Sequence, residues 1–393
     1  MPPPTALEVG RRIAHHRRIA RMTQQQLADA AGLGAGTLRK IERGARGASD
    51  AVLDAIADAL GIDVTRLHRD PDRAADRVHD AMPTLRAVLA CWDDPDDGPV
   101  RSLAELRAAV AESAAHRLGA QYLRIMRTGP GLLVELLRTL HATPAGGRQE
   151  LARLAVAACR SVDAVAYKYR ALDASGRLLD LMRSLTPLAD DPITNATVAY
   201  VRTEAFFAGR AHAAGLRALE RAIDAALPPA SAPTAAARAA LHMRAAVIAG
   251  RAADHDAATE HMRHAEELAD RVPEGVYDGT AVGPDSVRIH EVSLAVSLGD
   301  RALPRALEIA REWAPPKSMP AERRSAFYIE LSRAQLWAGQ PADAFESLKV
   351  ARRIAPQHAR EHRWVREDVA TLRRLRRADA ESLSAYAEWC GAG

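Results

Sequence analysis

Two histidine pairs have the spacing that metal binding requires. His261 and His264 stand three residues apart, and His358 and His362 stand four apart, so each pair shares one face of a helix. The His-Glu pair at 290–291 lacks the second histidine of a zinc-protease motif. The simpler explanation is that these are exposed histidines on ordinary helices, and metal binding is the alternative. Because phosphate loops and nucleophile motifs are also missing, we predict no metal, no cofactor and no catalytic residue, and therefore no enzyme.

Basic side chains at helical spacing form a second group. In a helix predicted over residues 35–43, Gly36, Arg39, Lys40 and Arg43 fall within an arc of roughly 100°, opposite the apolar residues. Guanidinium and ammonium groups donate hydrogen bonds to phosphates and to guanine O6 and N7, and one helix fits the major groove of B-DNA. The pattern predicts a face that contacts DNA. A small helical bundle with a solvated basic face is the alternative.

A shorter helix must hold that face in place. Thr23 is a favourable N-cap for a helix over residues 24–31, in which Leu27 and Ala30 are predicted to point inward. Gly32 can take the positive φ that ends this helix and turns the chain. The two helices together predict a helix-turn-helix.

Residues 7–67 resemble the DNA-binding domain of the lambda Cro/repressor-like family, also called the XRE family. The matching residues are Ile13 and Arg17, followed by TQQQLA, AGL, TLRKIERG, AVLDAIADALGI and VTRL. The resemblance implies a five-helix domain whose second motif helix enters the major groove. It implies base contacts from Ala35, Gly36 and Lys40, with Arg39 as a further reader. It implies phosphate contacts from Arg17, Gln24 and Arg43, with Thr37 in either role.

Several positions depart from the family pattern. Gly34 stands where Ser or Thr usually caps the second helix, and Ala35 and Gly36 stand where polar readers are usual. Gly34 and Gly36 each weaken the helix start by up to ~1 kcal/mol. His16 replaces a usual Leu, and Arg21 replaces a common Gly. With few side chains to read bases, specificity is expected to be modest or to depend on DNA shape.

Charge and cysteine content narrow the class of protein. Residues 1–47 hold nine Arg or Lys and three Asp or Glu, whereas the whole 393-residue chain nets only +4. A positively charged N-terminal segment on an otherwise near-neutral chain is typical of a protein that binds DNA through that segment. Three separated cysteines indicate a reducing compartment. Because we find no apolar signal core and no apolar run of ~18 residues, we predict a cytoplasmic protein without a membrane partner.

The remainder of the chain predicts a helical array. Alanine is abundant, aromatic residues make up 4%, and we find no convincing strand pattern. Residues 325–356 resemble a tetratricopeptide repeat, with Gly339 between two helices and Ala344, Leu348 and Ala351 along one face. Looser echoes occupy 207–226, 249–269 and 298–313. Trp364, Leu372, Leu375 and Trp389 are predicted to cover the last repeat.

These observations predict an all-α fold with two domains. We expect the helix-turn-helix domain over residues 1–70, a hinge over 71–80, and a tetratricopeptide-like solenoid over 81–393. The combination resembles a group of actinobacterial regulators and, more distantly, peptide-pheromone-responsive regulators. Pheromone receptors of that kind hold peptides with several asparagines, whereas this chain has only Asn195.

We therefore predict a sequence-specific transcriptional regulator that binds double-stranded DNA as a homodimer. Its array is expected to sense a small molecule, a peptide or a protein. The alternative is a protein-interaction adaptor whose helix-turn-helix is vestigial and binds DNA without regard to sequence. An antitoxin fits the first domain but not an array of this length.

Overall fold

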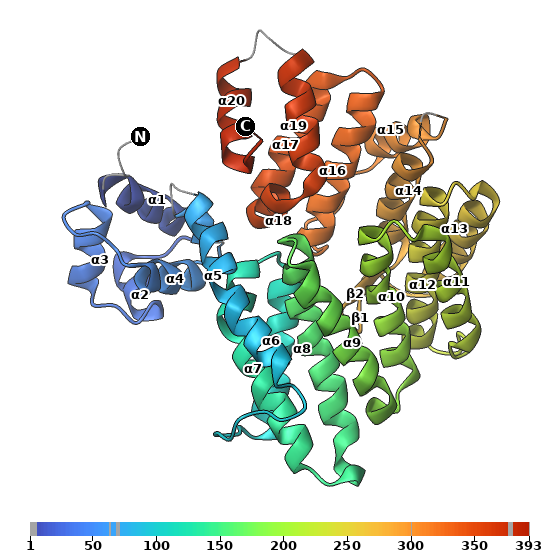
Figure 1. Cartoon of the computed structure of the whole chain (residues 1–393). Coiled ribbons are helices and arrows are strands. Elements are labelled where there is room, and N and C mark those ends of the chain that lie inside the picture. Colours follow the sequence, from blue (N-terminus) through green and yellow to red (C-terminus); the bar gives the residue numbers. More distant parts are fainter. Residues whose placement is uncertain (1–5, 63, 68–70, 300, 376–379, 393) are drawn as a thin grey trace. The chain divides into compact units, whose positions relative to one another are not determined.

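The computed structural model describes residues 6–62, 64–67, 71–299, 301–375 and 380–392. Over these residues the chain forms twenty α-helices, two short 3-10 helices and one two-stranded hairpin, which confirms the all-α fold class (Figure 1). Their contacts divide the chain into two compact units, residues 1–77 and 78–393. No helix within the described ranges is long and apolar enough to cross a membrane.

The N-terminal unit is a small helical domain. Its elements are α1 (Ala6–Ile19), α2 (Gln24–Ala30), α3 (Ala35–Glu42), α4 (Asp50–Ala59) and the 3-10 helix η1 (Val64–Arg66). The fifth helix implied by the family resemblance is thus a single 3-10 turn.

The predicted start and end of α2 are confirmed. Thr23 and Gln26 form a reciprocal capping box, in which the Gln26 amide donates to Thr23 Oγ1 at 3.1 Å. Gly32 has a φ of 63°, as the turn requires. The prediction that Ala30 points inward is wrong, because Ala28 is buried beside Leu27 and Ala30 is exposed. Because α2 packs on both α3 and α4, the side of the helix that carries Ala28 is buried, and the side that carries Ala30 is not.

Helices α1 and α3 meet backbone to backbone at Gly10. A β-carbon on Gly10 would lie 2.2 Å from the carbonyl oxygen of Ile41 and 2.6 Å from that of Glu42. Gly10 therefore allows a crossing that no other residue permits without movement of the backbone. The sequence analysis did not single out this glycine.

Helix α5 (Pro71–Ala90) contains the segment predicted as a hinge. Residues 71–80 lie in its first half, and the division between the two units falls between Arg77 and Val78. Residues 68–70, at the end of the predicted first domain, lie outside the described residues.

The second unit continues as helix pairs. Its helices are α6 (Leu103–Leu118), α7 (Tyr122–Ala142), the 3-10 helix η2 (Ala145–Gly147), α8 (Arg148–Lys168), α9 (Leu172–Ala189), α10 (Pro192–Ala208), α11 (His212–Ala225), α12 (Ala232–Arg251), α13 (His255–Ala269), α14 (Pro284–Leu298), α15 (Leu303–Glu312), α16 (Ala321–Trp337) and α17 (Pro341–Ile354). Each even-numbered helix from α6 to α16 packs against the odd-numbered helix that follows it.

The turns inside these pairs reveal the repeat. Each contains a residue with positive φ among the described residues, and these residues are Ala120, Arg170, Arg210, Ala253, Gly299 and Gly339. They stand 40 to 50 residues apart, which is longer and less regular than the 34 residues of a standard tetratricopeptide repeat. The predicted break at Gly339 is confirmed, and Ala344, Leu348 and Ala351 are fully buried on α17.

A β-hairpin between α13 and α14 was not predicted. Strands β1 (Gly275–Tyr277) and β2 (Thr280–Val282) pair antiparallel, with Tyr277 opposite Thr280. Asp278 and Gly279 form the turn at φ values of 43° and 73°, which is the pattern of a type I′ turn. The Asp-Gly pair was the available signal, but strands of three residues are too short to show an alternating pattern.

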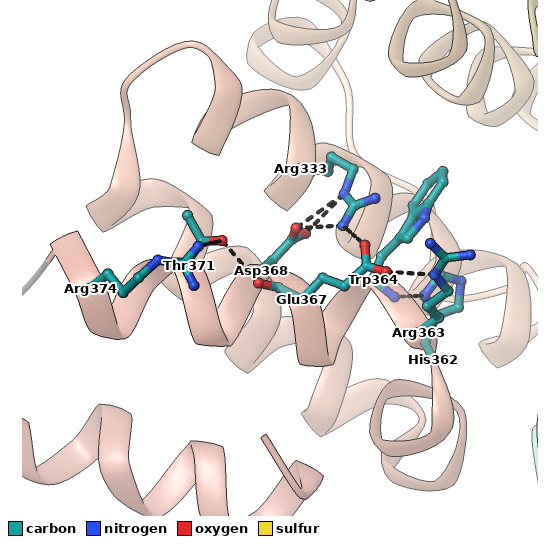
Figure 2. Close-up of polar contacts among 8 residues, drawn as sticks. All are labelled: Arg333, His362, Arg363, Trp364, Glu367, Asp368, Thr371 and Arg374. Atoms are coloured by element: carbon teal, nitrogen blue, oxygen red, sulfur yellow. Dashed lines mark hydrogen bonds and ion pairs between the residues drawn. The ribbon is translucent and has the colours of Figure 1, made fainter. Parts of the chain in front are cut away.

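The chain ends in α18 (Pro356–Glu361), α19 (Arg363–Leu375) and α20 (Ala380–Cys390). These helices cover the last repeat with Val365, Val369, Leu372 and Trp389, and Trp364 packs against the same core. Leu375, predicted to join them, is 61% exposed at the end of α19. Figure 2 shows Arg333 of α16 reaching Asp368 and Glu367 of α19 at 2.7 and 2.8 Å, which fixes α19 to the array.

The array of the second unit also closes on itself. Lys168 of α8 forms an ion pair with Glu322 of α16 at 2.6 Å, and the Leu123 amide of α7 donates to Gln357 Oε1 of α18 at 2.9 Å. The inner helices α6 and α16 are in direct contact. The even-numbered helices therefore surround a common interior.

Candidate nucleic-acid interface

Helix α3 has the two faces that its sequence predicts. Leu38 and Ile41 are buried in the N-terminal unit, whereas Gly36, Arg39 and Lys40 are exposed. Arg43, directly after the helix, is exposed as well. The structure thus brings three cations and a glycine together on the solvent side of α3, as predicted. Ala35 and Thr37 are half-buried at the edge of this face.

The three cations on this face are not used inside the N-terminal unit. Within the part of the chain that the structure describes, no hydrogen bond or ion pair engages the side chains of Arg39, Lys40 or Arg43. A solvated basic cluster of this kind can exchange its counterions for phosphate oxygens. These side chains are therefore available to a polyanion.

The first turn of α3 leaves backbone donors facing solvent. Gly34 is the N-cap, with φ −69° and ψ 135°, and it offers no side-chain acceptor to the helix. The first internal bond closes where the Thr37 amide donates to the Gly34 carbonyl at 2.8 Å. The amides of Ala35 and Gly36 thus lie at an uncapped helix N-terminus, where the helix dipole favours an anion. A side-chain cap would have competed for these donors.

Two residues implied as phosphate contacts are engaged within the domain. Arg17 of α1 donates to Glu42 of α3 through Nε at 2.7 Å and Nη2 at 3.0 Å, and Gln24 of α2 donates to Glu42 Oε2 at 2.6 Å. Burial alone would raise the pKa of Glu42, but the hydrogen bonds and charge of Arg17 and the bond from Gln24 lower it. This cluster joins all three helices, so Arg17 and Gln24 hold α3 in position.

The departures from the family pattern have local explanations. Arg21 has a φ of 55°, the conformation that glycine adopts most easily, which explains the glycine common at this position. His16 is half-buried, and burial with the nearby charge of Arg66 lowers its pKa. A neutral imidazole can occupy the place of a leucine without adding a buried charge.

The histidine pairs lie in different surroundings from those predicted. His261 meets His242, a histidine of α12 that the sequence analysis did not group with it, with their Nδ1 atoms 3.1 Å apart. His358 is buried rather than exposed, because it packs against the ring of Tyr122. Among the described residues, no group of three or more potential ligands has the arrangement of a metal site.

Comparison with known proteins bears on the N-terminal unit. Residues 8–69 match a family of helix-turn-helix domains. No curated protein matches the chain. Bacillus thuringiensis PlcR, solved in complex with the peptide PapR7 and DNA, is similar at 14% identity over 67% of this chain and 95% of that chain, with a TM-score of 0.29. A mutant of PrgX is similar at 9% identity over 97% of this chain and 99% of that chain, with a TM-score of 0.33. At such low identities and TM-scores, the helix-turn-helix match is the finding that bears on function.

Proposed function

We propose that this protein is a sequence-specific DNA-binding transcriptional regulator in which α3 enters the major groove. The observation that carries the proposal is the exposed face of Arg39, Lys40 and Arg43, which has no acceptor among the described residues of its own unit. The match to helix-turn-helix domains over residues 8–69 supports the same use of the face.

The residues on and directly after α3 have two roles in this proposal, contact with bases and contact with phosphates. Lys40 and Arg39 reach guanine O6 and N7, while Ala35 and Gly36 let the helix approach the bases closely. Arg43 and the amides at the start of α3 bind phosphate, and Thr37 contacts either. In this proposal Arg17 and Gln24 act through Glu42 by fixing the angle of α3.

The regulator acts as a homodimer in the cytoplasm. One module with this few cations makes too few phosphate contacts for tight binding, and two-fold operators with half-sites about one helical turn apart match a two-fold protein. The repeat unit senses a ligand or partner and controls the DNA-binding unit. The ring of even-numbered helices supports a sensing role, because stacked helical repeats present extended concave surfaces that bind ligands and partners.

The first test is affinity selection of sheared genomic DNA by the full chain, near physiological salt, followed by sequencing. We expect an enriched two-fold motif, which the variant Arg39→Ala/Lys40→Ala no longer enriches. Loss of two base-reading side chains should reduce specific affinity by about 2–6 kcal/mol. The matched control is Arg217→Ala/Arg221→Ala, which removes two exposed arginines from α11 of the other unit.

An adaptor with a vestigial helix-turn-helix gives a different result. It recovers all genomic fragments uniformly, with binding that weakens steeply as salt rises. The observation that favours this second candidate is the weak start of α3, where Gly34 and Gly36 lower the stability of the helix. A motif that survives unchanged in the double variant would contradict the proposed use of α3.

A further inference from the structure

Four arginines, two of them buried and two half-buried, meet one tyrosine in the interior of the second unit. The guanidinium carbons of Arg244 and Arg160 lie 4.4 and 5.6 Å from the ring centroid of Tyr200, and Arg323 donates to Tyr200 Oη at 2.7 Å. Arg117 is 6% exposed and faces the same group. The four arginines come from four different inner helices, α6, α8, α12 and α16, so only the closed array brings them together.

The charge of this arginine cluster is not balanced locally. Glu322 is already paired with Lys168 at 2.6 Å. Burial raises the pKa of Asp163 well above its ordinary value, which favours the neutral acid. Glu204 and Asp278 are further carboxylates that face the cluster among the described residues. Four guanidinium groups and Lys168 therefore face the three carboxylates of Glu322, Glu204 and Asp278, so the cations outnumber the anions.

The positive charge around Tyr200 lowers the pKa of its hydroxyl. Burial alone would raise the pKa of its hydroxyl, but Arg244, Arg323 and Arg160 lower it to about 8. A buried phenol is acidified in this way when the surroundings favour an anion. Burial and the charge of Arg117 lower the pKa of Arg160 to about 9, which has the same origin.

The tip of the β-hairpin supplies neutral acceptors to this cluster. Arg117 donates to the Gly279 carbonyl at 2.6 Å, and Arg160 donates to the Asp278 carbonyl and to Thr280 Oγ1, both at 2.6 Å. Hydrogen bonds from a guanidinium to a carboxylate or phosphate are about twice as strong as bonds between neutral groups. The hairpin thus offers the arginines neutral acceptors, which bind them less strongly than a carboxylate or phosphate would.

Two further donors of the cluster have no acceptor. Arg117 Nε and Arg244 Nε are buried without a hydrogen-bond partner in the described residues. A buried polar group without a partner costs about 1–3 kcal/mol. An anion with several oxygens would satisfy these donors, which the hairpin does not reach.

A cavity lies beside the hairpin and is bounded by Tyr200, the tyrosine that the arginines contact. Its volume is about 360 Å³, and it lies between α10, α12 and the hairpin. Tyr200 and Thr280 line it together with Thr197, and Ile193 and Ala240 give it an apolar part. Asp191 and Asp278 line it as well, and none of the four arginines does, so the cavity suits the apolar body of a small ligand whose anionic end lies beyond Tyr200, at the arginines.

We propose that Arg117, Arg160, Arg244 and Arg323 bind a ligand carrying a carboxylate or phosphate group, and that the hairpin tip is its internal substitute. The ligand's anionic group displaces the carbonyls of Asp278 and Gly279 from the arginines. This inference rests on the sensing role in the proposed function and gives it a site and a ligand chemistry. Because β2 leads directly into α14, release of the tip changes a segment joined to the array.

The test is hydrogen exchange of residues 275–282 in the full chain, in chloride, inorganic phosphate or succinate at equal ionic strength. We expect phosphate or succinate to accelerate exchange at the hairpin tip, since the anion frees it. In Arg244→Gln, which removes no hydrogen bond to the hairpin, the half-effect concentration should rise about tenfold, the value of one charge-assisted hydrogen bond. Arg217→Gln, an exposed arginine of α11, is the control and should respond like the wild type.

A second variant keeps the test decisive if Arg244→Gln does not fold. Thr280→Val removes only the hairpin's hydroxyl acceptor, so competition predicts a half-effect concentration several-fold lower, because the hairpin holds the arginines less well. Acceleration by phosphate alone identifies a phosphate ligand, and acceleration by succinate alone identifies a carboxylate. If exchange is the same in all three salts, in both the wild type and Thr280→Val, the arginines are structural and the inference is wrong.

Because this experiment contains no DNA, its outcome is independent of the operator test. A failure at the hairpin would leave the DNA-binding role intact. A failure of DNA selection would leave the anion site intact.

Discussion

At the scale of single residues, one carboxylate and one glycine fix how the first three helices of the N-terminal unit meet. Glu42 accepts hydrogen bonds from both Arg17 and Gln24, and so ties α1, α2 and α3 together through one carboxylate. Gly10 brings the backbones of α1 and α3 into contact. The exposed cations of α3 are useful to DNA only while these contacts hold the helix at a fixed angle.

Two glycines of this unit should respond oppositely to the same substitution. Gly10→Ala places a β-carbon 2.2 Å from a backbone oxygen, so we expect a loss of about 1–3 kcal/mol in the free energy of unfolding. Gly36→Ala meets no atom within 4 Å and should gain up to ~1 kcal/mol by favouring the helix. Chemical denaturation of the full chain, with hydrogen exchange reporting on α1 and α3, measures both. Equal effects of the two substitutions would contradict this account.

At the scale of elements, the repeat is defined by its turns. Six helix pairs turn through a residue with positive φ, yet only two of the six are glycines, Gly299 and Gly339. An L-residue in this conformation costs about 1–2 kcal/mol. The packing of the paired helices therefore imposes the turn on residues such as Ala253 that do not favour it.

Substitution of Ala253 by glycine should relieve that cost. Its φ is 61°, so we expect Ala253→Gly to raise the free energy of unfolding of the second unit by about 1 kcal/mol. Ala252→Gly is the matched control, because Ala252 has a φ of −80° and its replacement should destabilise by about 0.5–1 kcal/mol. Urea denaturation followed by circular dichroism distinguishes the two. A loss of stability in Ala253→Gly would show that the turn is not strained.

At the scale of the whole molecule, the second unit differs from an open solenoid because its ends meet. Open arrays are held by neighbouring repeats alone. Here Lys168 and Glu322, 154 positions apart in the sequence, form an ion pair with side chains only 17% and 13% exposed. Stability of the first helices of the unit therefore depends on the last.

Glu322→Gln should reveal that dependence. Burial alone would raise the pKa of Glu322, but Lys168 and Arg323 lower it well below its ordinary value of 4.5. The carboxylate thus stabilises the folded state above pH 4.5, and its contribution is lost as the pH falls below that value. Removing it near neutral pH leaves Lys168 without its partner, and we expect a loss of about 3 kcal/mol.

Hydrogen exchange checks where the loss occurs. Exchange in α8 should accelerate in Glu322→Gln although the substitution lies on α16, and the wild type should lose stability below pH 4.5 more steeply than the variant. Glu346→Gln is the control, since the pair of Glu346 with Lys349 on α17 is exposed and should contribute less than about 1 kcal/mol. Acceleration confined to α16 and α17 would contradict the closure.

The sequence by itself determined whatever depends on neighbours within a few turns of helix. Thr23, Gly32 and the faces of α3 were predicted correctly, because capping, turn conformation and helical periodicity are local. The same local logic located the last helix pair and the buried face of α17. It failed for the three-residue strands, whose only signal was the Asp-Gly turn.

Only the tertiary structure decided how distant polar groups pair. The contact of Arg17 with Glu42 spans 25 positions, and the contacts of Arg160 and Arg117 with the hairpin span 118 and 162. The even-numbered helices carry the four arginines of the cluster at irregular intervals, so no sequence period places them together. Closure of the array brings them to Tyr200, and the ligand site we infer arises from that closure, because a buried guanidinium is stable only where other groups converge to satisfy it.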